Sequence, residues 1–207
     1  MGSEQGNSTG ETPLESPAMN IIRPSLSRTP GDSRPVVVMT CGIAGAGKST
    51  LAKNIVRELP NFVRLSADGE VFKKYGLFAI DYPAEKYEEY LDEAADLVRN
   101  ELVRLLRDEP DKDIVLDLSF WNKEYRDEYK ALVDAAKARW VLVFLEANKE
   151  TLWGRIQSRR AKRDGAALGD AERNGDSAYD ISEEVFEMYW GGFERPEGEG
   201  EVVVQAA

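Results

Sequence analysis

The sequence predicts an α/β fold in which helices cover both faces of a parallel sheet. Three observations support this class. Short apolar runs alternate along the chain with longer segments of helical periodicity. The apolar runs lack a polar face, which is typical of strands that helices cover on both sides. The length of 207 residues suffices for one such domain with a full core but hardly for two.

The first strand and helix flank a glycine-rich segment. Residues 36–41 (VVVMTC) predict a buried strand, and residues 49–59 have the apolar spacing of a helix. Residues 62–65 predict a second strand, and a polar elbow at residues 66–69 follows it. Gly69 marks the exit from this elbow.

The rest of the chain continues the alternation. From Pro83, a residue well suited to the first position of a helix, apolar residues recur at helical spacing as far as Leu106. Further strands are expected at residues 113–118, 140–145 and 201–205, and further helices at residues 124–138, 149–160 and 182–189. Residues 161–180 are rich in Gly, Ala, Asp and Arg without an apolar period, so they predict a mobile loop.

Residues 42–49 read GIAGAGKS and fit the phosphate-binding P-loop pattern, with a strand before and a helix after them as the pattern requires. Glycines let the backbone wrap around an anion, so that amide groups and the helix N-terminus point at phosphate oxygens. Lys48 would reach the β and γ phosphates, and Ser49 would offer its hydroxyl to Mg²⁺. The candidate nucleotide-binding residues are Gly42, Ala44, Gly45, Ala46, Gly47, Lys48, Ser49 and Thr50.

Two acids are candidates for the chemistry. Asp117 lies at the end of the third strand, from which a carboxylate can hold Mg²⁺ through water. Asp68 follows the second strand and should lie at the carboxyl edge of the sheet, where open α/β folds bind ligands. An acid there could accept a proton from a substrate hydroxyl as it attacks the γ phosphate. Both positions also have plain structural explanations, because solvated acids end strands and Asp-Gly pairs favour tight turns.

A basic run follows the fourth strand. Arg155 and Arg159 are four residues apart on the expected helix, so one face carries both. A lid at about residues 161–180 could close them over the triphosphate, where they would stabilise charge in the transition state. A solvated charged face is the alternative explanation of such a run.

Composition excludes several mechanisms and partners. The chain has no histidine, so no imidazole can act as a base or metal ligand. A net charge of −11 argues against a general affinity for nucleic acid and favours a small substrate. Cys41 is the only cysteine, which excludes an intramolecular disulfide and fits a reducing, cytoplasmic location.

The N-terminal segment has a different composition. Residues 1–34 are rich in Gly, Ser, Thr and Pro, so we expect a disordered leader before a domain at residues 35–207. Pro24 and Pro30 should interrupt any amphipathic helix there. No stretch has the length and hydropathy of a membrane span, so no membrane association is expected.

With these motifs, residues 35–205 resemble the small P-loop kinases grouped with polynucleotide kinase, gluconate kinase and zeta-toxin-type phosphotransferases. The resemblance implies a three-layer P-loop NTPase fold with five parallel strands in the order 2-3-1-4-5. It implies that Asp68 is the general base and that Asp117 faces the P-loop. It also implies that Arg155 and Arg159 belong to the lid. Residues 116–121 (LDLSFW), Arg126-Asp127 and residues 193–196 (FERP) are similar to uncharacterised AAA-type ATP-binding proteins of this superfamily, which suggest no substrate.

One departure from polynucleotide kinase bears on the substrate. That enzyme has a substrate-gripping arginine three residues after its base, and Val71 stands at this position here. Nucleic-acid ends are therefore less favoured as substrates. Lys73 and Lys74 could replace the arginine for an anionic substrate, although surface lysines are common beside turns. Six aromatic residues near the expected acceptor side would suit a ring-bearing substrate or belong to the core: Phe72, Tyr75, Phe78, Tyr82, Phe120 and Trp121.

The expected function is an ATP-dependent, Mg²⁺-requiring transfer of the γ phosphate to a hydroxyl of a small molecule. Lys48, Asp68, Arg155 and Arg159 are the expected catalytic residues, Ser49 and Asp117 are expected to hold the metal, and Arg155 is also expected to contact the nucleotide. Two alternatives stay open: a nucleotide-dependent switch or slow ATPase that acts through a protein partner, and a kinase of nucleic-acid 5′-hydroxyls. The sequence leaves the acceptor and the oligomeric state open.

Overall fold

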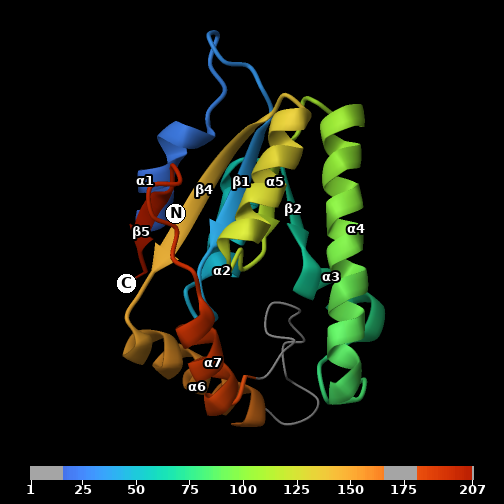
Figure 1. Ribbon diagram of the computed structural model, residues 1–207, viewed down its shortest axis with the longest axis vertical. Coiled ribbons are helices and arrows are strands. Elements are labelled where there is room, and N and C mark those ends of the chain that lie inside the picture. The colour runs from blue at the N-terminus through green and yellow to red at the C-terminus, as the bar shows by residue number, and fades with distance from the viewer. Residues whose placement is uncertain (1–15, 166–180, 207) are drawn as a thin grey trace, which may run out of the picture.

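The computed structural model describes residues 16–165 and 181–206, and at its centre lies a five-stranded sheet (Figure 1). All neighbouring strands pair in parallel, in the order β2-β3-β1-β4-β5. The strands are β1 Val36–Cys41, β2 Phe62–Ser66, β3 Asp113–Asp117, β4 Arg139–Glu146 and β5 Val202–Gln205. The predicted fold class and strand order are therefore confirmed.

Helices cover both faces of this sheet, as predicted. Those expected from apolar periodicity are α2 Lys48–Glu58, α4 Tyr87–Asp108, α5 Lys123–Ala135, α6 Lys149–Gly165 and α7 Glu183–Gly192. A short 3-10 turn, η1 Ala84–Lys86, follows Pro83 and leads into α4. Figure 1 shows α6 and α7 at the carboxyl ends of the strands, with α3 (Ala67–Tyr75) and α4 on the other side of that edge.

The two faces of the sheet have separate cores. Along β1, Val37 and Met39 pack with the side chains of α4 and α5, while Val36 and Val38 pack with those of α2 and of helix α1 (Pro17–Leu26). All six residues of β1 are buried, because a central parallel strand has no solvent-facing side. The P-loop that follows β1 thus starts from a fully buried strand.

The expectation that residues 1–34 form a disordered leader is wrong for the part that the structure describes. Residues Pro17–Leu26 form helix α1, in which Met19, Ile22 and Leu26 lie on one face and are buried. Three such apolar side chains suffice to anchor ten residues, so tertiary packing outweighs the poor local composition. Pro24 is tolerated in the last turn because the carbonyl that it leaves without an intrahelical bond belongs to Asn20, an exposed residue. Residues 1–15 lie outside the described residues.

The polar elbow predicted at residues 66–69 is instead the start of a helix, α3 Ala67–Tyr75. Ser66 is its N-cap and accepts a hydrogen bond at 3.2 Å from the backbone N–H of Gly69. Asp68 therefore lies in the first turn of a helix, where an acidic side chain is favoured by the helix dipole.

The region predicted as a lid is partly helical. Helix α6 continues to Gly165, five residues beyond the predicted end, and residues 166–180 lie outside the described residues. In the described parts of the chain, no helix has the length and apolar character needed to cross a membrane.

Candidate active site

The P-loop connects β1 to α2 and depends on three glycines with positive φ, namely Gly42 (+144°), Gly45 (+86°) and Gly47 (+96°). A Cβ atom on Gly42 or Gly45 would lie 2.8 Å from the backbone oxygen of Leu145 or Leu152, respectively. The loop is therefore pressed against the end of β4 and the start of α6. A Cβ on Gly47 would meet no atom within 4 Å, so the loop is open on that side, where phosphates could approach.

Lys48 begins helix α2 and folds back onto the loop. Its ammonium donates a hydrogen bond at 3.1 Å to the backbone oxygen of Ile43. Burial lowers the pKa of Lys48 below its ordinary value, and the nearby carboxylates of Asp117 and Asp68 oppose this shift. The N-cap of α2 is Gly47, which has no side chain to cap the first turn, so the first amides of the helix remain for an anion.

Asp117 at the end of β3 contacts both the P-loop helix and β2. Its Oδ1 accepts a hydrogen bond at 3.2 Å from the Ser49 hydroxyl. Its other oxygen accepts two hydrogen bonds from Arg64, at 3.0 Å from Nε and 2.5 Å from Nη2. The two residues predicted to hold Mg²⁺ thus lie side by side, and a partly buried ion pair with Arg64 fixes the orientation of the carboxylate.

The donor atoms of Ser49 and Asp117 suit Mg²⁺. A hydroxyl and a carboxylate oxygen 3.2 Å apart are hard oxygen ligands of the kind that this ion takes beside phosphates and water. Among the described residues no group of three or more acidic or cysteine side chains could hold a metal ion by itself. A bound Mg²⁺ would therefore need phosphate oxygens and water in addition to these two residues.

Asp68 lies in the first turn of α3 and is bonded by a side chain from α4. The hydroxyl of Tyr87 donates a hydrogen bond at 3.2 Å to Asp68 Oδ1. Burial and the charge of Asp68 raise the pKa of Tyr87 far above its ordinary value, so the hydroxyl keeps its proton and donates a hydrogen bond to this carboxylate. Because Asp68 also raises the pKa of Lys48 and of Arg159, its carboxylate lies within electrostatic reach of both cations.

The two predicted lid arginines have different surroundings. Arg155 donates at 3.1 Å to the backbone oxygen of Gly45 in the P-loop and at 3.3 Å to that of Ala206 after β5. It therefore links the loop to the C-terminal strand. Arg159, one turn further along α6, has its pKa lowered by burial, which the Asp68 carboxylate opposes. The transition-state role of both arginines stays a prediction.

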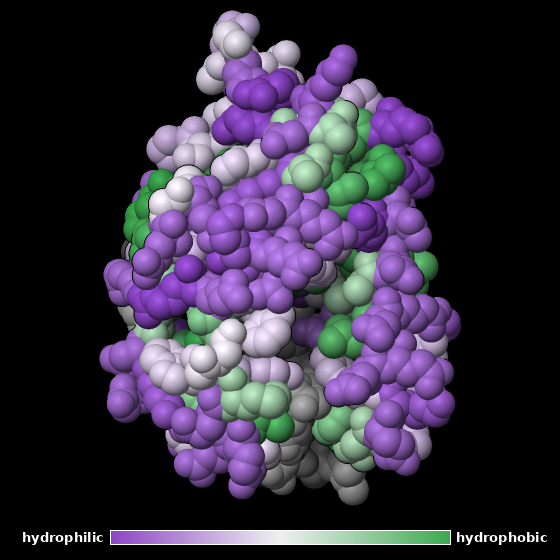
Figure 2. Space-filling model, viewed as in Figure 1, coloured by the Kyte–Doolittle hydropathy of each residue, from purple (hydrophilic) through white to green (hydrophobic). Residues whose placement is uncertain are grey.

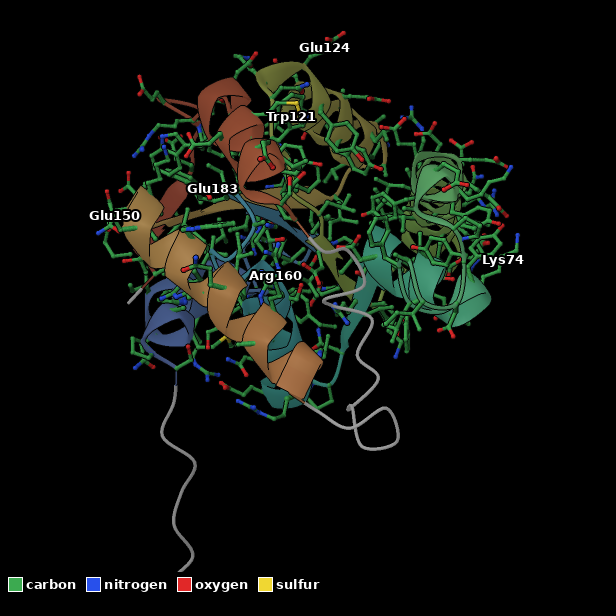
Figure 3. All side chains as sticks on the ribbon, turned by 90° about the horizontal axis from the view of Figure 1, so that it is seen from below. Lys74, Trp121, Glu124, Glu150, Arg160 and Glu183 are labelled. Carbon is green, nitrogen blue, oxygen red and sulfur yellow. The ribbon has the colours of Figure 1, made fainter. Side chains whose placement is uncertain are left out.

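Lys73 and Lys74, the lysines considered for binding an anionic substrate, interact with glutamates on α3 and α4. Lys74 pairs with Glu93 on α4, and Lys73 lies 3.7 Å from Glu70 in the same helix. Figure 3, which views the carboxyl edge of the sheet, shows Lys74 on the outer side of α3, far from Arg160. Of the six aromatic candidates, Phe120 belongs to the core, where it contacts Tyr125 and Tyr129.

Two contacts of the site are not predicted from the sequence: that of Arg64 with Asp117 and that of Tyr87 with Asp68. Arg64 was not assigned a role, although a charged residue within an apolar strand is a signal that it has a buried partner. Tyr87 was counted only as an apolar position of the helix. Nothing in its spacing indicates that its hydroxyl reaches Asp68, because the two residues meet only through the packing of α3 on α4.

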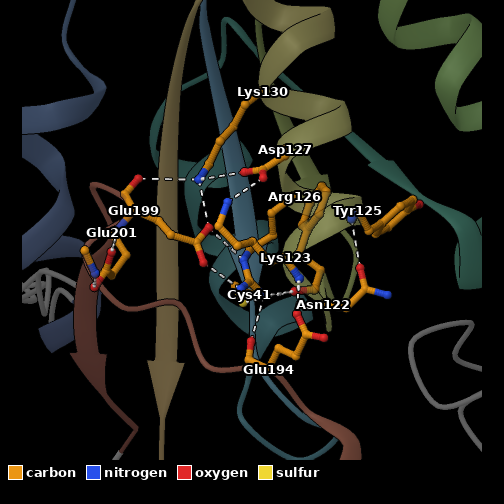
Figure 4. Close-up of polar contacts among 12 residues, drawn as sticks. Cys41, Asn122, Lys123, Tyr125, Arg126, Asp127, Lys130, Glu194, Glu199 and Glu201 are labelled. Atoms are coloured by element: carbon orange, nitrogen blue, oxygen red, sulfur yellow. Dashed lines mark hydrogen bonds and ion pairs between the residues drawn. The ribbon is translucent and has the colours of Figure 1, made fainter.

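Hydrogen bonds and ion pairs join the segment between α7 and β5 to helix α5 (Figure 4). The guanidinium of Arg126, fully buried, donates to both carboxylate oxygens of Glu199 at 3.0 and 2.6 Å and to the backbone oxygens of Phe120 and Glu194. Phe120 has a left-handed φ of +45° three residues after Asp117. Arg126 therefore holds the strained loop that follows Asp117.

Comparisons with known proteins agree with this architecture. Residues 37–196 match the model of a protein family described as the AAA domain. The fold is similar to that of a candidate kinase from Chloroflexus aurantiacus, with 20% identity and a TM-score of 0.61 over 84% of this chain and 88% of that one. It is also similar to a chain of the Pnkp1/Rnl/Hen1 RNA repair complex, with 18% identity and a TM-score of 0.57 over 77% of this chain and 44% of that one.

A third similar structure is Kti12 of Chaetomium thermophilum in complex with ADP-AlF3, with 16% identity and a TM-score of 0.53 over 83% of this chain and 88% of that one. No curated protein matches the sequence. At these identities the solved structures show the fold alone, and they confirm the predicted likeness to P-loop kinases at that level.

Proposed function

The chain belongs to the AAA domain family, and we propose that it is an ATP-dependent phosphotransferase that moves the γ phosphate to a hydroxyl of a small molecule. The observation that carries this proposal is the placement of Asp68. Its carboxylate interacts electrostatically with the P-loop lysine Lys48 and with Arg159, yet it is not part of the Ser49–Asp117 pair. A nucleotide switch would need no acid at this place.

The P-loop amides and Lys48 hold the triphosphate, and Ser49 with Asp117 would hold Mg²⁺. When bound, the ion would neutralise charge on the phosphates. The acceptor hydroxyl oxygen forms a bond to the γ phosphorus while its proton passes to the Asp68 carboxylate. The bond between the γ phosphorus and the bridging oxygen breaks, and ADP leaves with the electron pair. Asp68 then releases its proton to solvent.

The proposed location of the protein is the cytoplasm, where ATP is supplied. The acidic net charge and the pairing of Lys73 and Lys74 with glutamates favour a small acceptor over a nucleic-acid end. A nucleic-acid substrate would instead be expected to require unpaired basic side chains beside Asp68.

The test compares Asp68→Asn with Glu70→Gln, a matched control on the exposed side of the same helix. Transfer to the acceptor should fall about 100- to 10,000-fold in Asp68→Asn, because the amide cannot take the proton. Affinity for a fluorescent ATP analogue should stay within a few-fold, and the control should behave as wild type. Unchanged transfer in Asp68→Asn would refute the assignment of the base. An acceptor can be found by screening sugars, cyclitols, amino-alcohols, nucleosides and antibiotics for an ATP-dependent mass gain of one phosphate.

A further inference from the structure

An aromatic cluster stands beside Asp68. It is built by α3, the segment after it and the start of α4, and consists of Tyr75, Phe78, Tyr82, Tyr87 and Tyr90. Figure 1 places these elements across the carboxyl edge of the sheet from α6 and α7, and the surface seen in Figure 2 is mostly hydrophilic over both parts. Asp68 contacts this cluster through Tyr87, so an acceptor bound at Asp68 would lie near aromatic rings.

Two tyrosine hydroxyls in the cluster differ in their hydrogen bonding. That of Tyr87 donates to Asp68. The hydroxyl of Tyr82 is buried and has no hydrogen-bond partner within the described parts of the chain. The residue is only 7% exposed. A buried polar group without a partner is rare, and its free-energy cost calls for a ligand or water that completes it.

The ring of Tyr82 is held in place. Its centroid lies 5.2 Å from that of Tyr90, 6.3 Å from that of Phe78 and 6.4 Å from that of Tyr75, all edge to face. The hydroxyl therefore cannot turn out to solvent without disrupting the cluster. Burial raises the pKa of Tyr82, and the charge of Asp68 raises it further, so the hydroxyl stays protonated and lies within electrostatic reach of the proposed base.

The cluster offers an aromatic surface and hydroxyl groups, and the lysines of α3 are engaged with glutamates. Lys74 pairs with Glu93 and Lys73 with Glu70, both on the exposed side. An acid, two tyrosine hydroxyls and aromatic rings suit an uncharged ligand with several oxygens and an apolar face. A sugar or a cyclitol has this chemistry, because its ring carries adjacent hydroxyls around faces of C–H groups.

We propose that Tyr82 selects the acceptor, and that the acceptor is an uncharged polyol whose reacting hydroxyl bonds Asp68 while a neighbouring oxygen accepts a hydrogen bond from Tyr82. This inference rests on the proposed function. The transfer itself is unchanged: the reacting oxygen bonds the γ phosphorus, its proton goes to Asp68, and ADP leaves. Tyr82 fixes which hydroxyl is presented and keeps its own proton.

The first test uses Tyr82→Phe, which removes one oxygen and keeps the ring, with Tyr90→Phe as the control in the same cluster. Each is assayed with a polyol substrate and with the analogue that lacks the neighbouring hydroxyl. Wild type should prefer the polyol at least tenfold in kcat/KM, because the deoxy analogue leaves Tyr82 unpaired. Tyr82→Phe should lose that preference with an unchanged KM for ATP, whereas Tyr90→Phe should retain it. An equal loss for both acceptors, or no loss, would overturn the inference.

The second test needs no substrate. If the Tyr82 hydroxyl is unpaired in the free protein, Tyr82→Phe should raise the Tm or leave it unchanged. A lower Tm would mean that the hydroxyl has a partner in the free protein, and the inference would fail. Transfer to an amino-alcohol or nucleoside but to no polyol would also overturn it while leaving the proposed function intact. Transfer to no acceptor, with ATP still bound, would overturn both.

Discussion

At the scale of single residues, the two acids of the site are held in different ways. Asp117 is buried and accepts hydrogen bonds from Ser49 on one oxygen and from Arg64 on the other. Asp68 accepts a hydrogen bond from the hydroxyl of Tyr87. A carboxylate that is fixed by an arginine keeps its negative charge, which suits a place beside a metal ion.

This difference gives a prediction for Asp117→Asn. The amide keeps the size of the side chain but not its charge. The gain in ATP affinity on addition of Mg²⁺ should therefore be smaller than in wild type, by about tenfold or more. Titration calorimetry with and without Mg²⁺ measures the effect. Asp127→Asn, on the exposed surface of α5, is the control. An identical Mg²⁺ dependence in Asp117→Asn and wild type would remove Asp117 from the metal site.

At the scale of elements, the sequence predicted what periodicity alone determines. The five strands and the helices after them have unbroken apolar patterns, and their order followed from the family resemblance. Helices α1 and α3 were missed because their local composition favours turns. Ser66, Asp68 and Gly69 read as an elbow, although Ser66 caps a helix. Contacts such as Tyr87 with Asp68 depend on how elements pack, and no local pattern encodes them.

Helix α1 provides a direct test of this correction, because two adjacent isoleucines differ in burial. Ile22 is fully buried and Ile21 is 50% exposed. Ile22→Ala should lower the free energy of unfolding by about 2–5 kcal/mol, the usual cost of emptying such a buried site. Ile21→Ala should change it by less than about 0.5 kcal/mol. Urea denaturation measures both, and equal values would mean that α1 does not pack on the sheet in solution.

At the scale of the whole molecule, the C-terminal segment closes the fold around the site. Arg126 and Lys130 on α5 both pair with Glu199, and these ion pairs join the segment before β5 to helix α5. The hydrogen bond from Arg126 and the further one from Lys130 lower the pKa of Glu199 to about 2, against the opposing effect of burial. Glu146 and Arg195 form a second ion pair of this segment. Together they hold the end of the chain, where Ala206 accepts from Arg155.

The low pKa of Glu199 predicts an acid-dependent contribution to stability. Its ordinary pKa is 4.5, so the contribution is complete above that pH and is lost as the pH falls toward about 2. At pH 7, Glu199→Gln should lower the free energy of unfolding by about 3 kcal/mol, since Arg126 is left buried without its partner charge. The deficit relative to wild type should shrink steadily below pH 4.5. The exposed Glu197→Gln is the control, and a deficit that is the same at pH 7 and pH 3 would contradict the assigned ion pair.

In the proposed reaction, the γ phosphate passes directly to the acceptor hydroxyl, and Asp68 takes the proton of that hydroxyl. The most direct measurement is the amount of ADP and of phosphorylated acceptor formed in one reaction, by wild type and by Asp68→Asn. Wild type should form one phosphorylated acceptor for each ADP, and Asp68→Asn should form neither product while it still binds ATP. ADP formed without a phosphorylated acceptor, at the same rate in both proteins, would contradict the proposed reaction and point to a slow ATPase instead.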